Sequence, residues 1–188
     1  MKSTAADDDE LMRRVQQQDQ QAFTKLVDHY LGTLHGFAQR MLGNPTEADD
    51  VVQEAWLRVW QKSAQWHPQA AQLSTWLHRI VYNLCIDYYR NRKGEYVDIE
   101  TLDLPDEHQP AEFRQQADVE MQVKTALQQL PETQRSAIIL CHYQEMSNHE
   151  AAAVLEISVA ALESLLARGR RTLKKILQAQ ASNLLGEL

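Results

Sequence analysis

One predicted helix, from Ser74 to Lys93, carries the side chains with the clearest chemistry in this sequence. At about 100° per residue, its apolar residues form a stripe about 140° wide that suits packing against a core: Leu77, Ile80, Val81, Leu84, Cys85 and Tyr88. The opposite side, roughly 80° wide, gathers an aromatic, an amide and charged groups: Trp76, Arg79, Asn83, Asp87 and Arg90. Arginine neutralises phosphate, tryptophan offers a stacking surface, and asparagine pairs with the edge of a base. This side therefore predicts a site for an unpaired nucleic-acid strand, with a solvated face of no function as the alternative.

Two consecutive helical patterns near the C-terminus predict a helix-turn-helix. The first spans residues 146–155 with Ser147 as its N-cap, and the second spans residues 159–179 with Ser158 as its N-cap. On the second helix, polar and basic residues share one exposed side about 60° wide: Ser164, Arg168, Arg171 and Lys175. Such a side suits the major groove of DNA. An ordinary helical hairpin with a solvated basic edge is the alternative.

The helix predicted over residues 46–62, with Thr46 as its N-cap, is also two-faced. Its apolar side consists of Val52, Ala55, Trp56 and Val59. The opposite side is acidic and amidic with one apolar residue, and consists of Asp50, Gln53, Glu54 and Leu57. Leu57 and the nearby Trp60 would leave apolar area exposed, which favours a partner site over a merely solvated face.

These helices belong to a chain whose length of 188 residues and apolar content of 44% suit one large or two small domains. With 6 Gly and 5 Pro, and with Ala, Leu, Gln and Glu abundant, the chain should be mostly helical. Helices are expected at about residues 8–17, 21–42, 46–62, 74–93, 119–129, 132–144, 148–155 and 159–179. The predicted fold class is all-α, with two small helical domains at 1–93 and 118–188 and a flexible linker at 94–117. The linker is acidic, because residues 95–107 hold six acidic side chains and no Lys or Arg.

The net charge of −7 argues against a free-standing DNA-binding protein, which is usually basic. The charge is uneven, however, because residues 163–175 hold five basic side chains and one acidic one. Cys85 and Cys141 lie within apolar patterns and are expected to be reduced core thiols. The sequence contains neither a signal peptide nor an apolar run of membrane-spanning length, so we expect a soluble, cytoplasmic protein.

An enzyme is disfavoured, because the seven His are scattered and the sequence lacks HExxH, Gly-rich phosphate-loop and nucleophile-elbow motifs. Cys141, His142 and His149 could suggest a metal site, but Cys141 belongs to the apolar run of residues 137–141. We therefore expect no catalytic residue, metal or cofactor. Another alternative is an autonomous dimeric helix-turn-helix regulator whose N-terminal half senses a signal, although the acidity of the chain opposes tight independent DNA binding.

Motifs from Glu10 to Leu177 resemble those of the extracytoplasmic-function (ECF) sigma factors, the smallest sigma subunits of bacterial RNA polymerase. They occur in the order typical of the family: the opening helix at 9–30, DVVQE at 50–54, TWLHRI at 75–80, Asn83 with DYYR at 87–90, and LPE at 130–132 with Arg135. Four residues in or near the predicted helix-turn-helix depart from the family pattern: Cys141, Glu156, Glu163 and Leu165. Glu156 stands where Gly is frequent, and a left-handed backbone there would cost a non-Gly residue about 1 kcal/mol.

The resemblance implies roles for the three exposed faces. The first domain would bind core RNA polymerase through Asp50, Gln53, Glu54 and Leu57. It would also capture an unpaired base of the minus-ten promoter element in a pocket between the 63–73 loop and the helix that carries Trp76, Arg79, Asn83 and Arg90. The second domain would read the minus-thirty-five element through Ser164, Arg168, Arg170, Arg171 and Lys175. The implied partners are core polymerase, promoter DNA and an anti-sigma factor, which can be membrane-anchored, with no small-molecule substrate.

Overall fold

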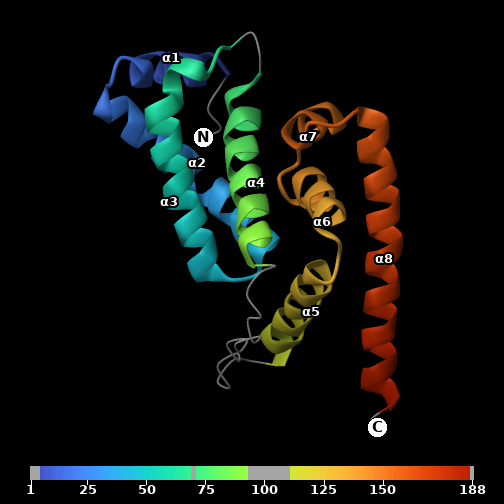
Figure 1. The fold of residues 1–188 in the computed structure, drawn as a ribbon. Coiled ribbons are helices and arrows are strands. Elements are labelled where there is room, and N and C mark those ends of the chain that lie inside the picture. Colours follow the sequence, from blue (N-terminus) through green and yellow to red (C-terminus); the bar gives the residue numbers. More distant parts are fainter. Residues whose placement is uncertain (1–4, 69–70, 93–110, 187–188) are drawn as a thin grey trace.

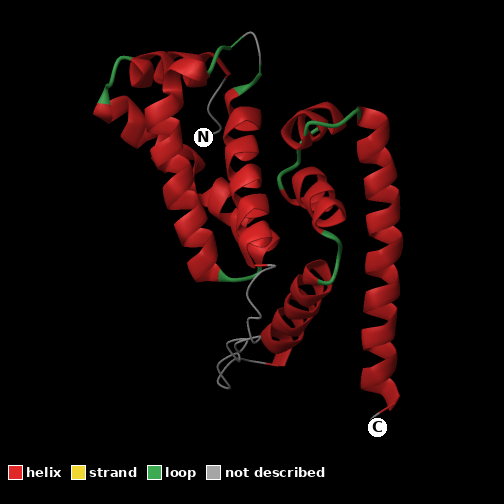
Figure 2. Cartoon of the chain, viewed as in Figure 1, coloured by secondary structure: helices red, strands yellow, loops and turns green. Residues whose placement is uncertain are grey.

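The computed structural model describes residues 5–68, 71–92 and 111–186, whose regular structure is entirely helical (Figure 2). The first half contains α1 (Ala5–Gln16), α2 (Gln20–Leu42), α3 (Pro45–Lys62), the 3-10 helix η1 (Ser63–Gln65) and α4 (Leu73–Arg92). The second half contains α5 (Ala111–Gln128), α6 (Glu132–Ile138), the π-helical turn η2 (Ile139–Tyr143), α7 (Asn148–Leu155) and α8 (Val159–Gly186) (Figure 1). The all-α prediction is confirmed. Among these described helices, none is long and apolar enough to cross a membrane.

In the first half, α2, α3 and α4 pack against one another and α1 lies against α2 (Figure 1). The predicted apolar stripes face this core and are buried: Val52, Ala55, Trp56 and Val59 from α3, and Leu77, Val81, Leu84 and Cys85 from α4. Ile80 and Tyr88 are half-buried at its edge. The hydroxyl of Tyr30 donates to the buried Asp8 carboxylate at 2.5 Å, which ties α1 to α2.

A tight junction connects α2 to α3. Gly43 ends α2 in the left-handed conformation, at φ 80°. Asn44 then caps α3, because its side-chain oxygen accepts hydrogen bonds from the backbone amides of Thr46 (2.9 Å) and Glu47 (3.4 Å). The prediction of Thr46 as the N-cap is wrong, since Pro45 takes the first helical position, where its missing N–H would have had no helical partner.

The second half contains the predicted helix-turn-helix, in α7 and α8. Ser147 and Glu150 form a reciprocal capping box at the start of α7. The hydroxyl of Ser158 accepts from the backbone amide of Ala161 at 3.2 Å and so caps α8. Between the two helices Glu156 adopts the left-handed conformation, at φ 56° and ψ 40°. All three features agree with the sequence prediction.

Helix α5 begins at Ala111, directly after Pro110, instead of at about residue 119. The residues from Ala111 onward are mostly good helix formers, which favours the earlier start. Residues 94–110 of the predicted linker lie outside the described part of the chain. The division into 1–93, 94–117 and 118–188 therefore stays a prediction.

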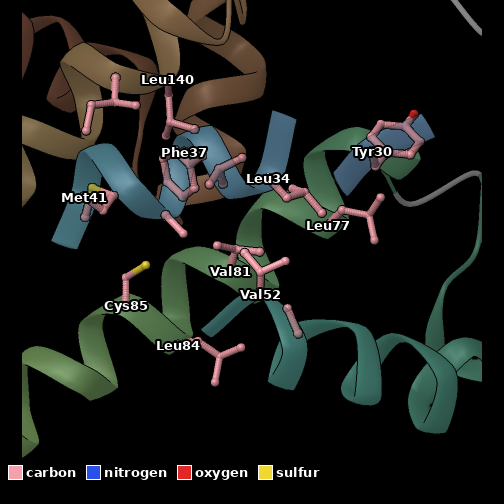
Figure 3. Close-up of a cluster of buried hydrophobic side chains, with 14 of the residues drawn as sticks. Tyr30, Leu34, Phe37, Met41, Val52, Leu77, Val81, Leu84, Cys85 and Leu140 are labelled. Atoms are coloured by element: carbon pink, nitrogen blue, oxygen red, sulfur yellow. The ribbon is translucent and has the colours of Figure 1, made fainter. Parts of the chain in front are cut away.

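The two halves share one hydrophobic core. Figure 3 shows Leu140 of η2 beside the part of the core that Phe37 and Met41 of α2 form, and all three side chains are fully buried. Helix α7 also packs against α4 (Figure 1). The sequence, read one helix at a time, had not indicated this contact between the halves.

Candidate nucleic-acid and protein interfaces

The predicted face of α3, here called the α3 face (Asp50, Gln53, Glu54 and Leu57), is exposed at all four residues. Leu57 keeps 52% of its surface exposed and is one of the large apolar side chains that stay in solvent among the described residues. Glu54 is held by an ion pair with Arg58, at 2.8 Å between Oε1 and Nε. The structure therefore brings these four residues together, as the helical period predicts.

An apolar groove of about 510 Å³ lies beside the α3 face, and its lining includes Phe23 and Val27 of α2 as well as Trp56, Leu57 and Trp60 of α3. The ring of Phe23 meets Trp56 and Trp60 edge-on, at centroid distances of 5.8 Å and 4.9 Å. Trp60 is half-buried by this packing and contributes less exposed area than its position on α3 suggested. Sequence analysis missed Phe23 and Val27, because a groove between helices depends on how the helices pair.

The predicted nucleic-acid face of α4 is only partly free. Asn83 and Arg90 are exposed, and Arg90 lies 3.7 Å from the carboxylate of Asp87 on the same helix. Trp76 is half-buried and packs against the core, so only part of its ring surface can stack on a base. Arg79 is exposed and forms an ion pair with Glu156 of the helix-turn-helix turn.

His78, directly before Arg79 on α4, is almost fully buried. Its Nδ1 lies 2.8 Å from the carbonyl oxygen of Ser74, and its ring meets Phe37 edge-on at 5.5 Å. Burial lowers the pKa of His78, and the hydrogen bond to Ser74 opposes this effect. The histidine is thus part of the packing of α4 and does not belong to its exposed face.

The basic side of α8 lines a second groove, of about 560 Å³, whose cationic residues are Arg168, Arg171, Lys174 and Lys175. Gln134 of α6 completes one wall. Gly169 lies where α6 approaches α8, and a Cβ there would lie 2.8 Å from Cδ1 of Ile138, so a side chain at this position would force Ile138 to shift. The structure therefore joins three of the predicted residues and adds Lys174, which the sequence analysis did not select for this surface.

Ser164 and Arg170 do not line the basic groove. Ser164 is exposed one turn earlier on α8, and its carbonyl oxygen accepts from Nε of Arg168 at 3.3 Å. Arg170 extends to His142 of η2, with Nη2 at 3.1 Å from Nε2. Arg170 is exposed and can still reach a phosphate, but it would do so from outside the basic groove.

The cysteines differ from one another. Cys85 is buried, and burial raises the pKa of its thiol to about 12. Cys141 is half-buried and packs against the edge of the core. The π-helical turn places it near Arg170, and burial raises the pKa of its thiol against the opposing effect of that charge. Over the described residues, no group of three or more His, Cys, Asp or Glu is arranged to hold a metal ion.

Family models match both halves of the chain: the Sigma-70 region 2 model over residues 26–95 and the Sigma-70 region 4 model over residues 120–173. The ECF RNA polymerase sigma factor SigW of Bacillus subtilis is 32% identical over 178 residues, which cover 89% of this chain and 95% of SigW. The chain belongs to the ECF sigma factors. Another relative is the RNA polymerase sigma-H factor of Pseudomonas aeruginosa, which is 30% identical over 186 residues; these cover 93% of this chain and 96% of the Pseudomonas protein.

Solved structures have the same fold. CnrH, in its complex with the cytosolic domain of CnrY, matches 92% of this sigma factor with a TM-score of 0.70 and 29% identity. The sigma factor RpoE from Bartonella quintana, in complex with the anti-sigma factor NepR, matches 83% of it with a TM-score of 0.66 and 24% identity. The family is non-enzymatic, so the exposed faces of α3, α4 and α8 concern recognition and not catalysis.

Proposed function

We propose that this ECF sigma factor, which directs RNA polymerase to promoters, binds core polymerase through the α3 face and the apolar groove beside it. The observation that carries this assignment is the exposure of Leu57 among Asp50, Gln53 and Glu54, next to a groove lined by aromatic rings. Apolar contact supplies most of the energy of such an interface, and the carboxylates select a basic partner surface and accelerate association.

Charge reversal tests the polymerase interface. The double variant Asp50→Lys and Glu54→Lys should abolish co-purification with core polymerase and leave the helical circular dichroism unchanged, because both side chains are exposed. Asp9→Lys with Glu10→Lys is a matched control on α1, since Asp9 is also exposed and Glu10, like Glu54, is paired with an arginine of its own helix. Normal assembly of the Asp50 and Glu54 variant would contradict the assignment.

We propose that Arg79 and Asn83 of α4, with part of Trp76, hold an unpaired base of the minus-ten element. Extracting a base from the stack costs a few kcal/mol, which contacts with the extracted base must offset. Arg79→Ala and Asn83→Ala should slow open-complex formation with little loss of thermal stability, because both residues are exposed. A template with a pre-melted bubble should partly restore the rate, whereas the absence of any rescue would assign these residues to a different step.

We propose that the basic groove of α8 binds the phosphates of the minus-thirty-five element. Arg168, Arg171, Lys174 and Lys175 lie on a single groove, so several phosphates can be neutralised at once. Lys174→Ala should weaken binding of holoenzyme to all promoters alike and reduce the slope of log K against log salt by about 1. Lys25→Ala on α2 removes an exposed charge elsewhere and should leave the slope unchanged. A loss confined to particular base sequences would instead indicate that Lys174 reads bases.

We propose further that an anti-sigma factor covers the same apolar groove when the sigma factor is inactive. CnrH, a neighbour at 29% identity, has been solved with the cytosolic domain of CnrY, which supports a partner of this kind. A photo-crosslinking amino acid at position 57 should give adducts both with polymerase and with a second, smaller protein in uninduced cells. Adducts with polymerase subunits alone would exclude the anti-sigma factor from this groove.

A further inference from the structure

One ion pair joins the nucleic-acid face of α4 to the turn of the helix-turn-helix. Nη2 of Arg79 donates to Oε1 of Glu156, and the two side chains retain 45% and 56% of their surface. Glu156 directly follows α7, in a left-handed conformation that L-amino acids other than Gly seldom adopt. Its placement is set by the backbone, since the amide of the following residue, Ile157, donates to the carbonyl of Ala152 at 3.0 Å.

The ion pair forms part of a wider contact between the two halves. The side chain of Gln128 donates to the carbonyl oxygen of Arg40 at 2.8 Å, and the Arg40 guanidinium lies 4.7 Å from the ring centroid of Tyr143. The buried Arg135 donates to the carbonyl oxygen of Met41 at 2.5 Å. The chain in this structure is therefore closed, with α7 against α4.

The closed arrangement cannot engage both promoter elements. Their names place them about 25 base pairs apart, which corresponds to about 85 Å of DNA at about 3.4 Å per base pair. Arg79, proposed to act at the minus-ten element, is in hydrogen-bond contact with Glu156, two residues before the cap of the helix proposed to act at the minus-thirty-five element. The two halves must separate before both helices can bind one promoter.

We propose that Glu156 is a built-in competitor of promoter DNA for Arg79. A carboxylate presents to a guanidinium the same charged oxygen acceptors as a phosphate, so Glu156 occupies Arg79 while the chain is closed. The pair is solvent-exposed and therefore weak, and it tunes the closed state without locking it. Glycine would be less strained at this left-handed position, and the proposal explains why a glutamate stands there instead: only a side chain with a carboxylate can pair with Arg79. The inference rests on the proposed role of Arg79 at the minus-ten element.

Glu156→Gln in the full-length chain tests the competition. The variant keeps the size of the side chain and removes the charge. Glu145→Gln is the matched control, because Glu145 is also exposed and also has a left-handed backbone, at φ 55°. Both variants lose one negative charge, so a general effect of charge on DNA affinity is the same in each. The two readouts are the radius of gyration from small-angle X-ray scattering and the affinity for a labelled single-stranded oligonucleotide selected for binding to the wild-type chain.

Relative to the control, Glu156→Gln should increase the radius of gyration and tighten oligonucleotide binding by about 1.4-fold to fivefold, the range set by an exposed ion pair. Equal behaviour of the two variants would overturn the proposal, as would a larger radius without tighter binding. Arg79→Ala separates this failure from failure of the proposed function. If Arg79→Ala weakens oligonucleotide binding while Glu156→Gln matches its control, only the competition is wrong; if Arg79→Ala binds as tightly as the wild type, the minus-ten role of Arg79 is wrong.

Discussion

Replacing Arg135 by Ala is expected to destabilise the protein as a whole, although the residue belongs to the second half. Arg135 is 5% exposed and its guanidinium donates to Met41 O (2.5 Å), Gln128 O and Oε1 (both 2.7 Å) and Leu130 O (3.0 Å), as well as to the hydroxyl of Tyr89. Because α5 ends at Gln128, the carbonyl of Gln128 has no partner within the helix, and the arginine satisfies it, and that of Leu130 just beyond the helix, with a favourable charge.

The magnitude follows from what the substitution leaves behind. The carbonyl of Met41 keeps its hydrogen bond from the Tyr89 hydroxyl, whereas the carbonyls of Gln128 and Leu130 lose a charged donor. At about 1–3 kcal/mol for each stranded buried group, and with the packing of the side chain lost as well, the free energy of unfolding should fall by about 3–5 kcal/mol. A loss of that size is a large share of the roughly 5–15 kcal/mol typical of a folded domain.

Urea denaturation followed by two signals is the appropriate assay. All tryptophans, at positions 56, 60, 66 and 76, lie in the first half, so their fluorescence reports that half, while circular dichroism reports helices in both. In Arg135→Ala both transitions should move together to lower urea. Arg135→Lys, which keeps the charge but not the fork of donors, should fall between Arg135→Ala and the wild type. A loss below about 1 kcal/mol, or a tryptophan transition that does not move, would refute the shared core.

Three further predictions concern the helices themselves. Asn44→Ala removes the cap of α3 and should lower the free energy of unfolding by about 1 kcal/mol in urea denaturation, while Thr46→Ala should have little effect. Gly169→Ala should force the buried Ile138 side chain to shift, and we expect this cost to exceed the roughly 1 kcal/mol that alanine gains over glycine within a helix, so hydrogen exchange in α6 and α8 should accelerate. Burial lowers the pKa of His78 in the folded state below its ordinary value of 6.5, so stability is complete above that pH and falls as the unfolded chain takes up a proton below it. His78→Gln should reduce this decline between about pH 6.5 and pH 5 in urea titrations, and an unchanged decline would contradict the assignment.

The local part of this structure follows from the sequence, because helical period and capping chemistry act over a few residues. The exposed α3 face, the stripe of α4 and the caps at Ser147 and Ser158 all agree with prediction for that reason. The cap of α3 was misplaced because two capping residues flank a proline and the proline decides between them.

Features that depend on contact between distant helices were not predictable in this way. The apolar groove needs Phe23 of α2 beside Trp60 of α3, and the basic groove needs Gln134 of α6 beside α8. The burial of His78 arises because a second layer of helices covers a side of α4 that a single stripe would leave in solvent. The pairing of Arg79 with Glu156 joins residues 77 positions apart and has no local signal.

In vitro transcription by purified core RNA polymerase on a pool of randomised promoters tests the central claim most directly. With the wild-type chain, we predict initiation at templates that share a minus-ten and a minus-thirty-five motif, and with the Asp50→Lys and Glu54→Lys variant, initiation at the level of core polymerase alone. Transcripts whose number and start sites are the same with and without the wild-type chain would contradict the claim that these faces form a promoter-selecting subunit.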